Sequence, residues 1–133
     1  MKDSTVIIIA EDSVPDLYLV REALKSHLGE YELLVARDGD EVRGLLNRVG
    51  TDLPKPDLLL LDLNMPGIDG PELFALMRQH PLCVNVPLVV LTSSDSPADH
   101  KWTNEFNVSH YFHKPTNFDQ FMQLGVVVRG LVG

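Results

Sequence analysis

The chain has 133 residues, enough for one domain with a single hydrophobic core. Its formal net charge of −8 argues against nucleic-acid binding, which needs a cationic surface, and the absence of a long apolar run argues against a membrane protein. The single cysteine, Cys83, excludes an internal disulfide and, with no signal-peptide pattern at the N-terminus, favours the cytoplasm. We therefore expect residues 1–133 to form one cytoplasmic domain.

The first half of the chain predicts two strand–helix units. Residues 6–10 are apolar and mostly β-branched and predict a strand, and Pro15 suits the first turn of the helix that follows. Residues 31–36 predict a second strand. Asp38 and Glu41 resemble an acidic capping box at the start of the next helix. The alternation of elements indicates an α/β protein.

The second half continues the same alternation. Residues 57–61 contain an unbroken leucine run that predicts a strand buried on both faces, as in the centre of a parallel sheet. Pro71 opens a helix, residues 87–91 predict the fourth strand, and a helix over 97–106 leads to a short fifth strand at 109–112. Repeated units with short connections imply right-handed crossovers, so we predict a doubly wound, parallel (βα)5 sheet covered by helices on both sides.

Polar residues follow four of the predicted strands. Glu11 and Asp12 follow the first, Asp62 the third, Thr92 the fourth and Lys114 the fifth. Because the carboxyl ends of parallel strands lie at one edge of the sheet, we expect these side chains to surround one crevice. Crowded carboxylates repel one another unless a cation neutralises them, and oxygen ligands with open positions favour Mg²⁺. A carboxylate beside Mg²⁺, an ammonium and a hydroxyl has the parts needed for phosphoryl transfer.

These residues, in this order, resemble the receiver domain of the response regulators of two-component systems, including the single-domain chemotaxis regulator. The resemblance covers essentially the whole chain and implies the flavodoxin-like strand order 2-1-3-4-5. It also implies that Asp62 accepts a phosphoryl group from the phosphohistidine of a sensor histidine kinase. Lys114 and Thr92 would then be the catalytic partners of Asp62.

The resemblance also implies a magnesium site. Asp12, Asp62 and the backbone carbonyl of Asn64 would bind Mg²⁺, and Glu11 would assist, directly or through water. From the residues alone, Glu11 and Asp12 could equally cap the helix that opens near Pro15, and the two roles can coexist.

Tyr111 lies on the fifth predicted strand, at the position of the family's switch aromatic. The resemblance implies that its ring moves with Thr92 when Asp62 is phosphorylated. The alternative is an edge-strand aromatic that packs on the last helix. The neighbouring His110 and His113 lack metal-ligand spacing, and we expect both at the surface.

Two further stretches make the chain most similar to the response regulators of phytochrome-type photoreceptor kinases. These are the long connection at residues 47–56 and the segment 114–121, which reads Lys-Pro-Thr-Asn-Phe-Asp-Gln-Phe. The resemblance implies that the partner kinase is a phytochrome.

The C-terminal segment, residues 117–133, differs from a routine amphipathic helix. Its apolar residues do not fit one stripe, and Gly125, Gly130 and three consecutive valines weaken the helix. A helix that is apolar on several sides must be buried on more than one side. We therefore expect a homodimer formed through this helix and the face of the fifth strand. Local burial against the sheet, with a disordered tail, is the alternative.

Three other functions are compatible with parts of this pattern. A phosphatase of the haloacid-dehalogenase type needs an Asp two residues after its nucleophile, where this chain has Asn64, and carries the nucleophile on the first strand. A flavin-binding module needs a phosphate-cradling loop after the first strand, where residues 11–15 are acidic and lack Gly. A phosphorylation-independent docking module is the third. We predict a signalling protein without an output domain, which catalyses only its own phosphorylation and dephosphorylation.

Overall fold

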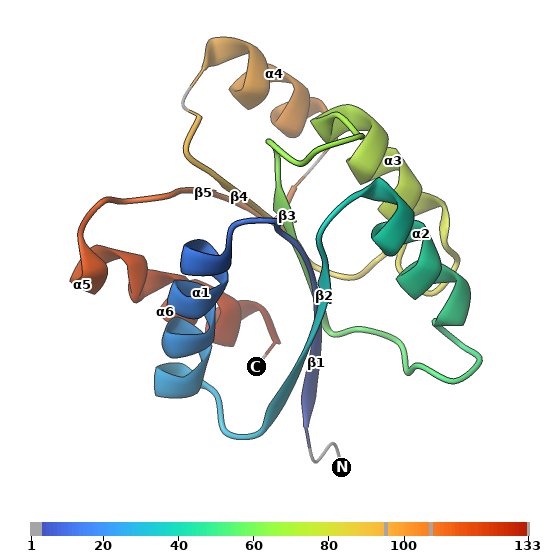
Figure 1. The fold of residues 1–133 in the computed structure, drawn as a ribbon, viewed down its shortest axis with the longest axis horizontal. Coiled ribbons are helices and arrows are strands. Elements are labelled where there is room, and N and C mark those ends of the chain that lie inside the picture. Colours follow the sequence, from blue (N-terminus) through green and yellow to red (C-terminus); the bar gives the residue numbers. More distant parts are fainter. Residues whose placement is uncertain (1–3, 95, 107, 133) are drawn as a thin grey trace.

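The computed structural model describes residues 4–94, 96–106 and 108–132. Five parallel strands form one sheet in the order β2-β1-β3-β4-β5 (Figure 1). The strands are β1 (Thr5–Ala10), β2 (Tyr31–Ala36), β3 (Leu58–Asp62), β4 (Leu88–Thr92) and β5 (His110–His113). The predicted doubly wound, flavodoxin-like fold is confirmed, and no predicted strand boundary is wrong by more than one residue.

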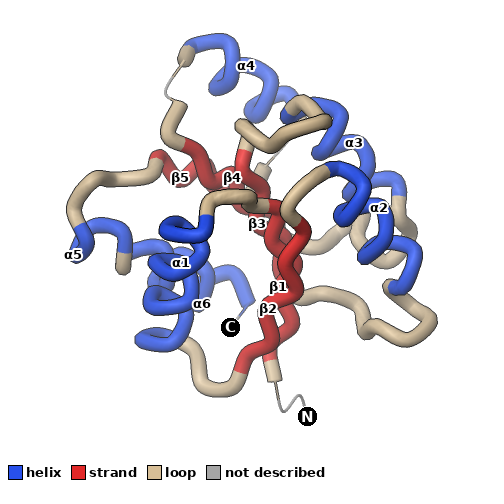
Figure 2. The backbone as a smooth tube through the Cα atoms, viewed as in Figure 1, coloured by secondary structure: helices blue, strands red, loops and turns tan. Residues whose placement is uncertain are grey.

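Helices cover both faces of this sheet (Figure 2). They are α1 (Val14–His27), α2 (Gly39–Arg48), α3 (Gly70–Gln79), α4 (Pro97–Glu105), α5 (Phe118–Phe121) and α6 (Gln123–Val132). α1, α5 and α6 pack on one face, whereas α2 and α3 pack on the other with α4 beside them. No described helix has both the length and the apolar character that crossing a bilayer requires.

The leucine run of β3 supplies both cores. Leu58 and Leu60 pack with α1 and α6, and Leu59 and Leu61 pack with α2 and α3, as expected for side chains that alternate across a strand. All four are fully buried. Burial of each contributes about 2 kcal/mol, so β3 is held firmly from both sides and its carboxyl end is a fixed platform.

Side-chain caps begin the helices that rise from the carboxyl edge of the sheet. The oxygens of Ser13, Asp38, Asp69, Ser96 and Asn117 each accept a hydrogen bond from the backbone N–H three residues later. The predicted box at Asp38 takes a modified form, since the Glu41 carboxylate accepts from the N–H of Arg37, one residue before the cap. These caps fix where each helix starts relative to the crevice.

The C-terminal segment is divided at Met122 into α5 and α6. Gly125 explains the close packing of α6 on α1, because a Cβ at this position would collide with the Ala23 carbonyl and the His27 ring. Phe121, Leu124 and Val128 are buried, so much of the apolar character has a local explanation. Phe118 and Val126 nevertheless remain 52% and 49% exposed, and the expected apolar surface is present in part.

Candidate functional site

Three carboxylates meet at the carboxyl edge of the sheet. Glu11 and Asp12 follow β1, and Asp62 is the last residue of β3. One carboxylate oxygen from each lies within 4.8 Å of the others. Glu11 and Asp62 are buried, whereas Asp12 is exposed at the mouth of the site. The predicted convergence of these acids is therefore confirmed.

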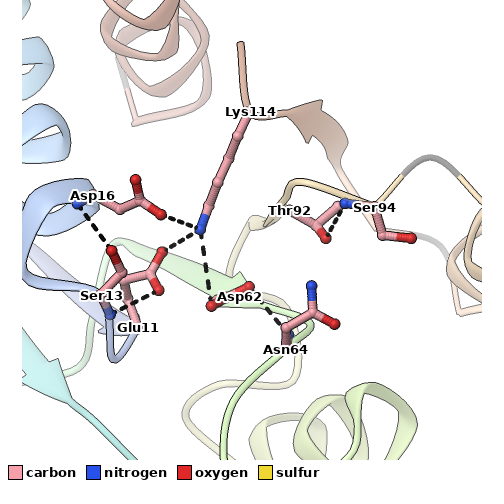
Figure 3. A network of polar contacts seen from close by, with 8 residues as sticks. All are labelled: Glu11, Ser13, Asp16, Asp62, Asn64, Thr92, Ser94 and Lys114. Carbon is pink, nitrogen blue, oxygen red and sulfur yellow. Dashed lines mark hydrogen bonds and ion pairs between the residues drawn. The ribbon is translucent and has the colours of Figure 1, made fainter. Parts of the chain in front are cut away.

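The two oxygens of Asp62 have different surroundings (Figure 3). Oδ1 accepts a hydrogen bond of 3.1 Å from the backbone N–H of Asn64, in the loop that turns away from β3. That loop reverses through Gly67, whose φ of +79° lies in the left-handed region that favours glycine. Oδ2 lies on the side of Lys114, 3.9 Å from its Nζ. Oδ1 thus has a backbone hydrogen bond, whereas Oδ2 faces the Lys114 ammonium at ion-pair distance.

Lys114 reaches the acids from the end of β5. Its backbone N–H donates to the Thr92 carbonyl at 2.7 Å and extends the pairing of β4 with β5. Its Nζ donates to Glu11 Oε1 and to Asp16 Oδ2, both at 2.7 Å. The side chain is only 10% exposed. The expected position of Lys114 beside Asp62 is confirmed, but its shortest contacts are to two other acids.

Asp16 is the member of this network that sequence reasoning missed. It lies in the first turn of α1, and its backbone N–H donates to Ser13 Oγ at 3.3 Å. Because α1 begins at the crevice, a carboxylate in its first turn can face the site. The available signal was its place in the first turn of the helix that follows Glu11 and Asp12, both of which were expected at the crevice.

Charge is unbalanced in this pocket. Burial and the neighbouring Asp62 carboxylate raise the pKa of Glu11 to about 7, although Lys114 opposes the shift. Burial disfavours the Lys114 ammonium, but its bonds to Asp16 and Glu11 outweigh this effect and raise the pKa of Lys114. Among the described residues, a single ammonium thus faces several carboxylates. A hard divalent cation fits this donor set, because it would offset the negative charge and accept oxygen ligands.

The hydroxyl side of the site lies on β4. Thr92 is fully buried, one residue beyond the β4 partner of Asp62, and its Oγ1 accepts from the backbone N–H of Ser94 at 3.0 Å. Tyr111 is half-buried on β5, and its hydroxyl donates to the Ser94 carbonyl at 2.8 Å. Its ring stacks on His100 of α4, with the centroids 4.1 Å apart. Thr92 and Tyr111 therefore contact the same loop residue.

A second chain of hydrogen bonds continues from Ser94 into α4. Ser94 Oγ donates to Asp99 at 2.7 Å, and Trp102 Nε1 donates to the other oxygen of that carboxylate at 3.1 Å. The hydrogen bond from Ser94 lowers the pKa of Asp99 more than burial raises it. The Trp102 ring in turn lies against Gly70 at the start of α3 and edge-on to Phe74. This chain joins the Thr92 loop to α4 and α3.

Comparison with known proteins identifies the family of the chain. Residues 7–124 match the family described as the response regulator receiver domain. The chain belongs to this family. The response regulator Rcp1 of Synechocystis sp. is 37% identical over 121 residues, which cover 90% of this chain and 82% of Rcp1.

Two solved structures resemble this receiver domain along most of its length. The phosphorylated cyanobacterial phytochrome response regulator RcpA is 33% identical, covers 96% of this chain and 90% of its own, and gives a TM-score of 0.82. The Mn²⁺-bound form of Rcp1 is 37% identical to this chain and gives a TM-score of 0.80. The match covers 95% of this chain and 90% of the Rcp1 chain. The similarity to phytochrome response regulators is therefore confirmed in sequence and in fold.

Family membership fixes the general role of the chain. It is a phosphoacceptor of two-component signalling rather than a true enzyme, as predicted, and receiver domains bind a divalent metal at their acidic site. The haloacid-dehalogenase and flavin-binding alternatives lose their support. The Tyr111 switch, the Asn64 carbonyl ligand and the homodimer stay predictions.

Proposed function

We propose that Asp62 accepts a phosphoryl group from the phosphohistidine of a sensor histidine kinase and that this changes a protein-binding face of the domain. One observation carries the proposal: Asp62 is held by the Asn64 N–H through Oδ1, while Oδ2 faces Lys114 across 3.9 Å. In the transfer, an Asp62 oxygen forms a bond to phosphorus as the bond from phosphorus to the histidine nitrogen breaks. The electron pair of that bond stays on the imidazole.

Mg²⁺ is the metal that we propose for the acidic pocket. Glu11, Asp12, Asp62 and the Asn64 backbone carbonyl would hold it, and it would neutralise charge on the phosphoryl oxygens. The clustering of three carboxylates supports this assignment. The Mn²⁺-bound form of Rcp1 supports a divalent cation of this kind.

Lys114 and Thr92 act on the phosphoryl oxygens in this proposal. The buried ammonium of Lys114 stabilises the negative charge that accompanies transfer. Thr92 Oγ1 already accepts from the Ser94 N–H, so its own proton remains for donation to a phosphoryl oxygen. A shift of Thr92 toward that oxygen would strain its bond to Ser94.

In this proposal, the change in the protein-binding face begins at the hydrogen bond between Thr92 and Ser94. Tyr111 donates to the Ser94 carbonyl, so a movement of Ser94 changes the position of the Tyr111 ring between β5 and α4. The altered face would consist of α4, β5 and the C-terminal helices. Phosphorylation adds roughly −1.5 to −2 charges at Asp62, which is enough to bias such a two-state loop.

We further propose a phytochrome-type kinase as the partner, because RcpA is described as a phytochrome response regulator.

A second copy of the chain is proposed to pack on the C-terminal helices and β5, since Phe118 and Val126 are exposed on these helices. Changing Val126→Glu leaves the buried side chains of α6 intact. A dimer that elutes early in size-exclusion chromatography should become a monomer, and an unchanged elution volume would place any dimer contact elsewhere.

The decisive experiment is phosphorylation by a small donor. The protein is incubated with Mg²⁺ and acetyl phosphate, and its intact mass is measured. A phosphate-sized gain that is absent in Asp62→Asn supports the proposal. A gain that persists in this variant moves the acceptor to another residue, and no gain in the natural chain favours the phosphorylation-independent docking module.

A further inference from the structure

We propose that Asp16 is a positioning residue that holds the Lys114 ammonium at the distance a phosphoryl group on Asp62 requires. This inference rests on the proposed function of Asp62. It concerns the carboxylate in the first turn of α1, which contacts Lys114 Nζ at 2.7 Å but lies outside the three-acid cluster identified among the described residues.

The number of donors on Lys114 supports this role. An ammonium group has three N–H donors. Two of them are engaged by Glu11 Oε1 and Asp16 Oδ2, each at 2.7 Å, so the remaining donor is left for Asp62 (Figure 3). Two short contacts orient a flexible side chain better than one, because each removes rotational freedom from the four-carbon stem.

The remaining distance is suited to a phosphoryl oxygen. Lys114 Nζ lies 3.9 Å from Asp62 Oδ2, which is too far for a hydrogen bond. A phosphoryl group on Asp62 carries its oxygens beyond the carboxylate and into this gap. If Lys114 were free to form a close pair with Asp62 instead, it would occupy this space and weaken the nucleophile.

Asp16 is better placed than Glu11 to keep this hold during the reaction. Glu11 belongs to the cluster that a divalent cation would occupy, and its second oxygen also accepts from the Ser13 N–H at 3.3 Å. A cation at the cluster competes with Lys114 for Glu11. Asp16 is then the anchor that remains, and the Ser13 cap fixes its place at the start of α1.

The test compares phosphorylation rates of Asp16 variants. With saturating Mg²⁺, the maximal rate of phosphorylation by acetyl phosphate should be roughly tenfold lower in Asp16→Ala than in the natural chain. The concentration of acetyl phosphate that gives the half-maximal rate should change little. Asp16→Asn keeps an oxygen acceptor and should fall between the two. Asp40→Asn is the matched control, because Asp40 is a first-turn carboxylate of α2 paired with Arg43, and it should leave the rate unchanged.

A double-mutant cycle separates positioning from a structural role. If Asp16 acts through Lys114, Asp16→Ala should have no further effect on the rate in a Lys114→Ala background. Urea denaturation shows whether each variant is folded under the assay conditions. An Asp16→Ala variant that is folded and as fast as the natural chain overturns the inference, as does an undiminished effect in the Lys114→Ala background.

The same assay keeps the two proposals apart. A phosphate gain in the natural chain that is lost in Asp62→Asn preserves the proposed function, whatever Asp16 does. A failure of the Asp16 variants alone then counts only against the positioning role. If the natural chain gains no phosphate at Asp62, the proposed function fails, and the inference about Asp16 fails with it.

Discussion

The two sides of Asp62 are built differently. On the β1 and α1 side, Glu11, Asp16 and Lys114 form a charged network with contacts of 2.7 Å, and two of its members are almost fully buried. On the β4 side, Thr92 Oγ1 accepts one neutral hydrogen bond from the backbone N–H of Ser94, and the charged Asp99 is bonded to Ser94 Oγ rather than to Thr92. A buried charged network is costly to open, whereas single neutral bonds contribute only about 1 kcal/mol each.

This difference suggests a division of work between the two sides. The charged side keeps its geometry and supplies the chemistry of transfer. The hydroxyl side is weak enough to rearrange when a phosphoryl group appears, and it connects to α4 through Asp99. Changes on the charged side should therefore affect stability and rate, and changes on the hydroxyl side should affect the response.

The largest expected effect is on stability after removal of the buried cation. Lys114→Met leaves Glu11 and Asp16 without their shared partner, and the free energy of unfolding should fall by about 3 kcal/mol. Thr92→Val removes one acceptor, that of the Ser94 N–H, and should cost about 1 kcal/mol. Urea unfolding followed by circular dichroism measures both. Equal losses would contradict the proposed contrast between the two sides.

The pH dependence of stability tests the charged side in a second way. The pKa of Glu11 is raised to about 7 in the folded protein from an ordinary value near 4.5, so the folded state binds more protons between these values. Stability of the metal-free protein should therefore fall as pH rises from about 4.5 to about 7, by roughly 1–3 kcal/mol, and level off above that.

Glu11→Gln is the control for this effect. The amide does not titrate, so the difference in unfolding free energy between the natural chain and the variant should change with pH only between about 4.5 and about 7. If both chains show the same dependence, other groups cause it. Mg²⁺ affinity of the natural chain should rise over the same interval, because the ligand must lose its proton.

Sequence patterns located the acids of the site for a simple reason. A leucine run that ends in Asp62 fixes a buried strand, and parallel neighbours bring Glu11 and Asp12 to the same edge. Whether Asp16 faces the site depends on how α1 is rotated about its axis, and an argument from strand ends does not specify that rotation. The division at Met122 also depended on tertiary packing, since it accompanies the close approach of Gly125 to α1.

The connection from Ser94 to α4 could not be predicted for a related reason. It depends on the conformation of the loop after β4, where Ser94 Oγ must point toward the first turn of α4 to reach Asp99. Serine and aspartate near a helix start usually indicate capping, and Ser96 does cap α4. Local sequence therefore predicts the Ser96 cap but not the hydrogen bond from Ser94 Oγ to the Asp99 carboxylate.

A smaller effect is expected when this connection is weakened. Asp99→Asn keeps an acceptor for Ser94 but loses the carboxylate that the hydrogen bonds stabilise, and it should cost about 1 kcal/mol of unfolding free energy. The rate of phosphorylation by acetyl phosphate should stay that of the natural chain, because Asp99 contacts neither Asp62 nor Lys114 in the described structure. A large loss of rate would place Asp99 in the chemistry rather than in the response.

The smallest expected signal is the fluorescence of Trp102, the single tryptophan of the chain. Its indole N–H donates a hydrogen bond to Asp99, and its ring packs on Gly70. Because Ser94 donates to the same carboxylate, a shift of Ser94 should move Asp99 and change the surroundings of Trp102. Phosphorylation with acetyl phosphate and Mg²⁺ should change the emission slightly, and Asp99→Asn should reduce that change while the phosphate gain persists. Asp119→Asn, an exposed first-turn carboxylate of α5, is the matched control. Emission that does not respond in the phosphorylated natural chain would mean that the hydroxyl side is as rigid as the charged side, because its movement is what Trp102 reports.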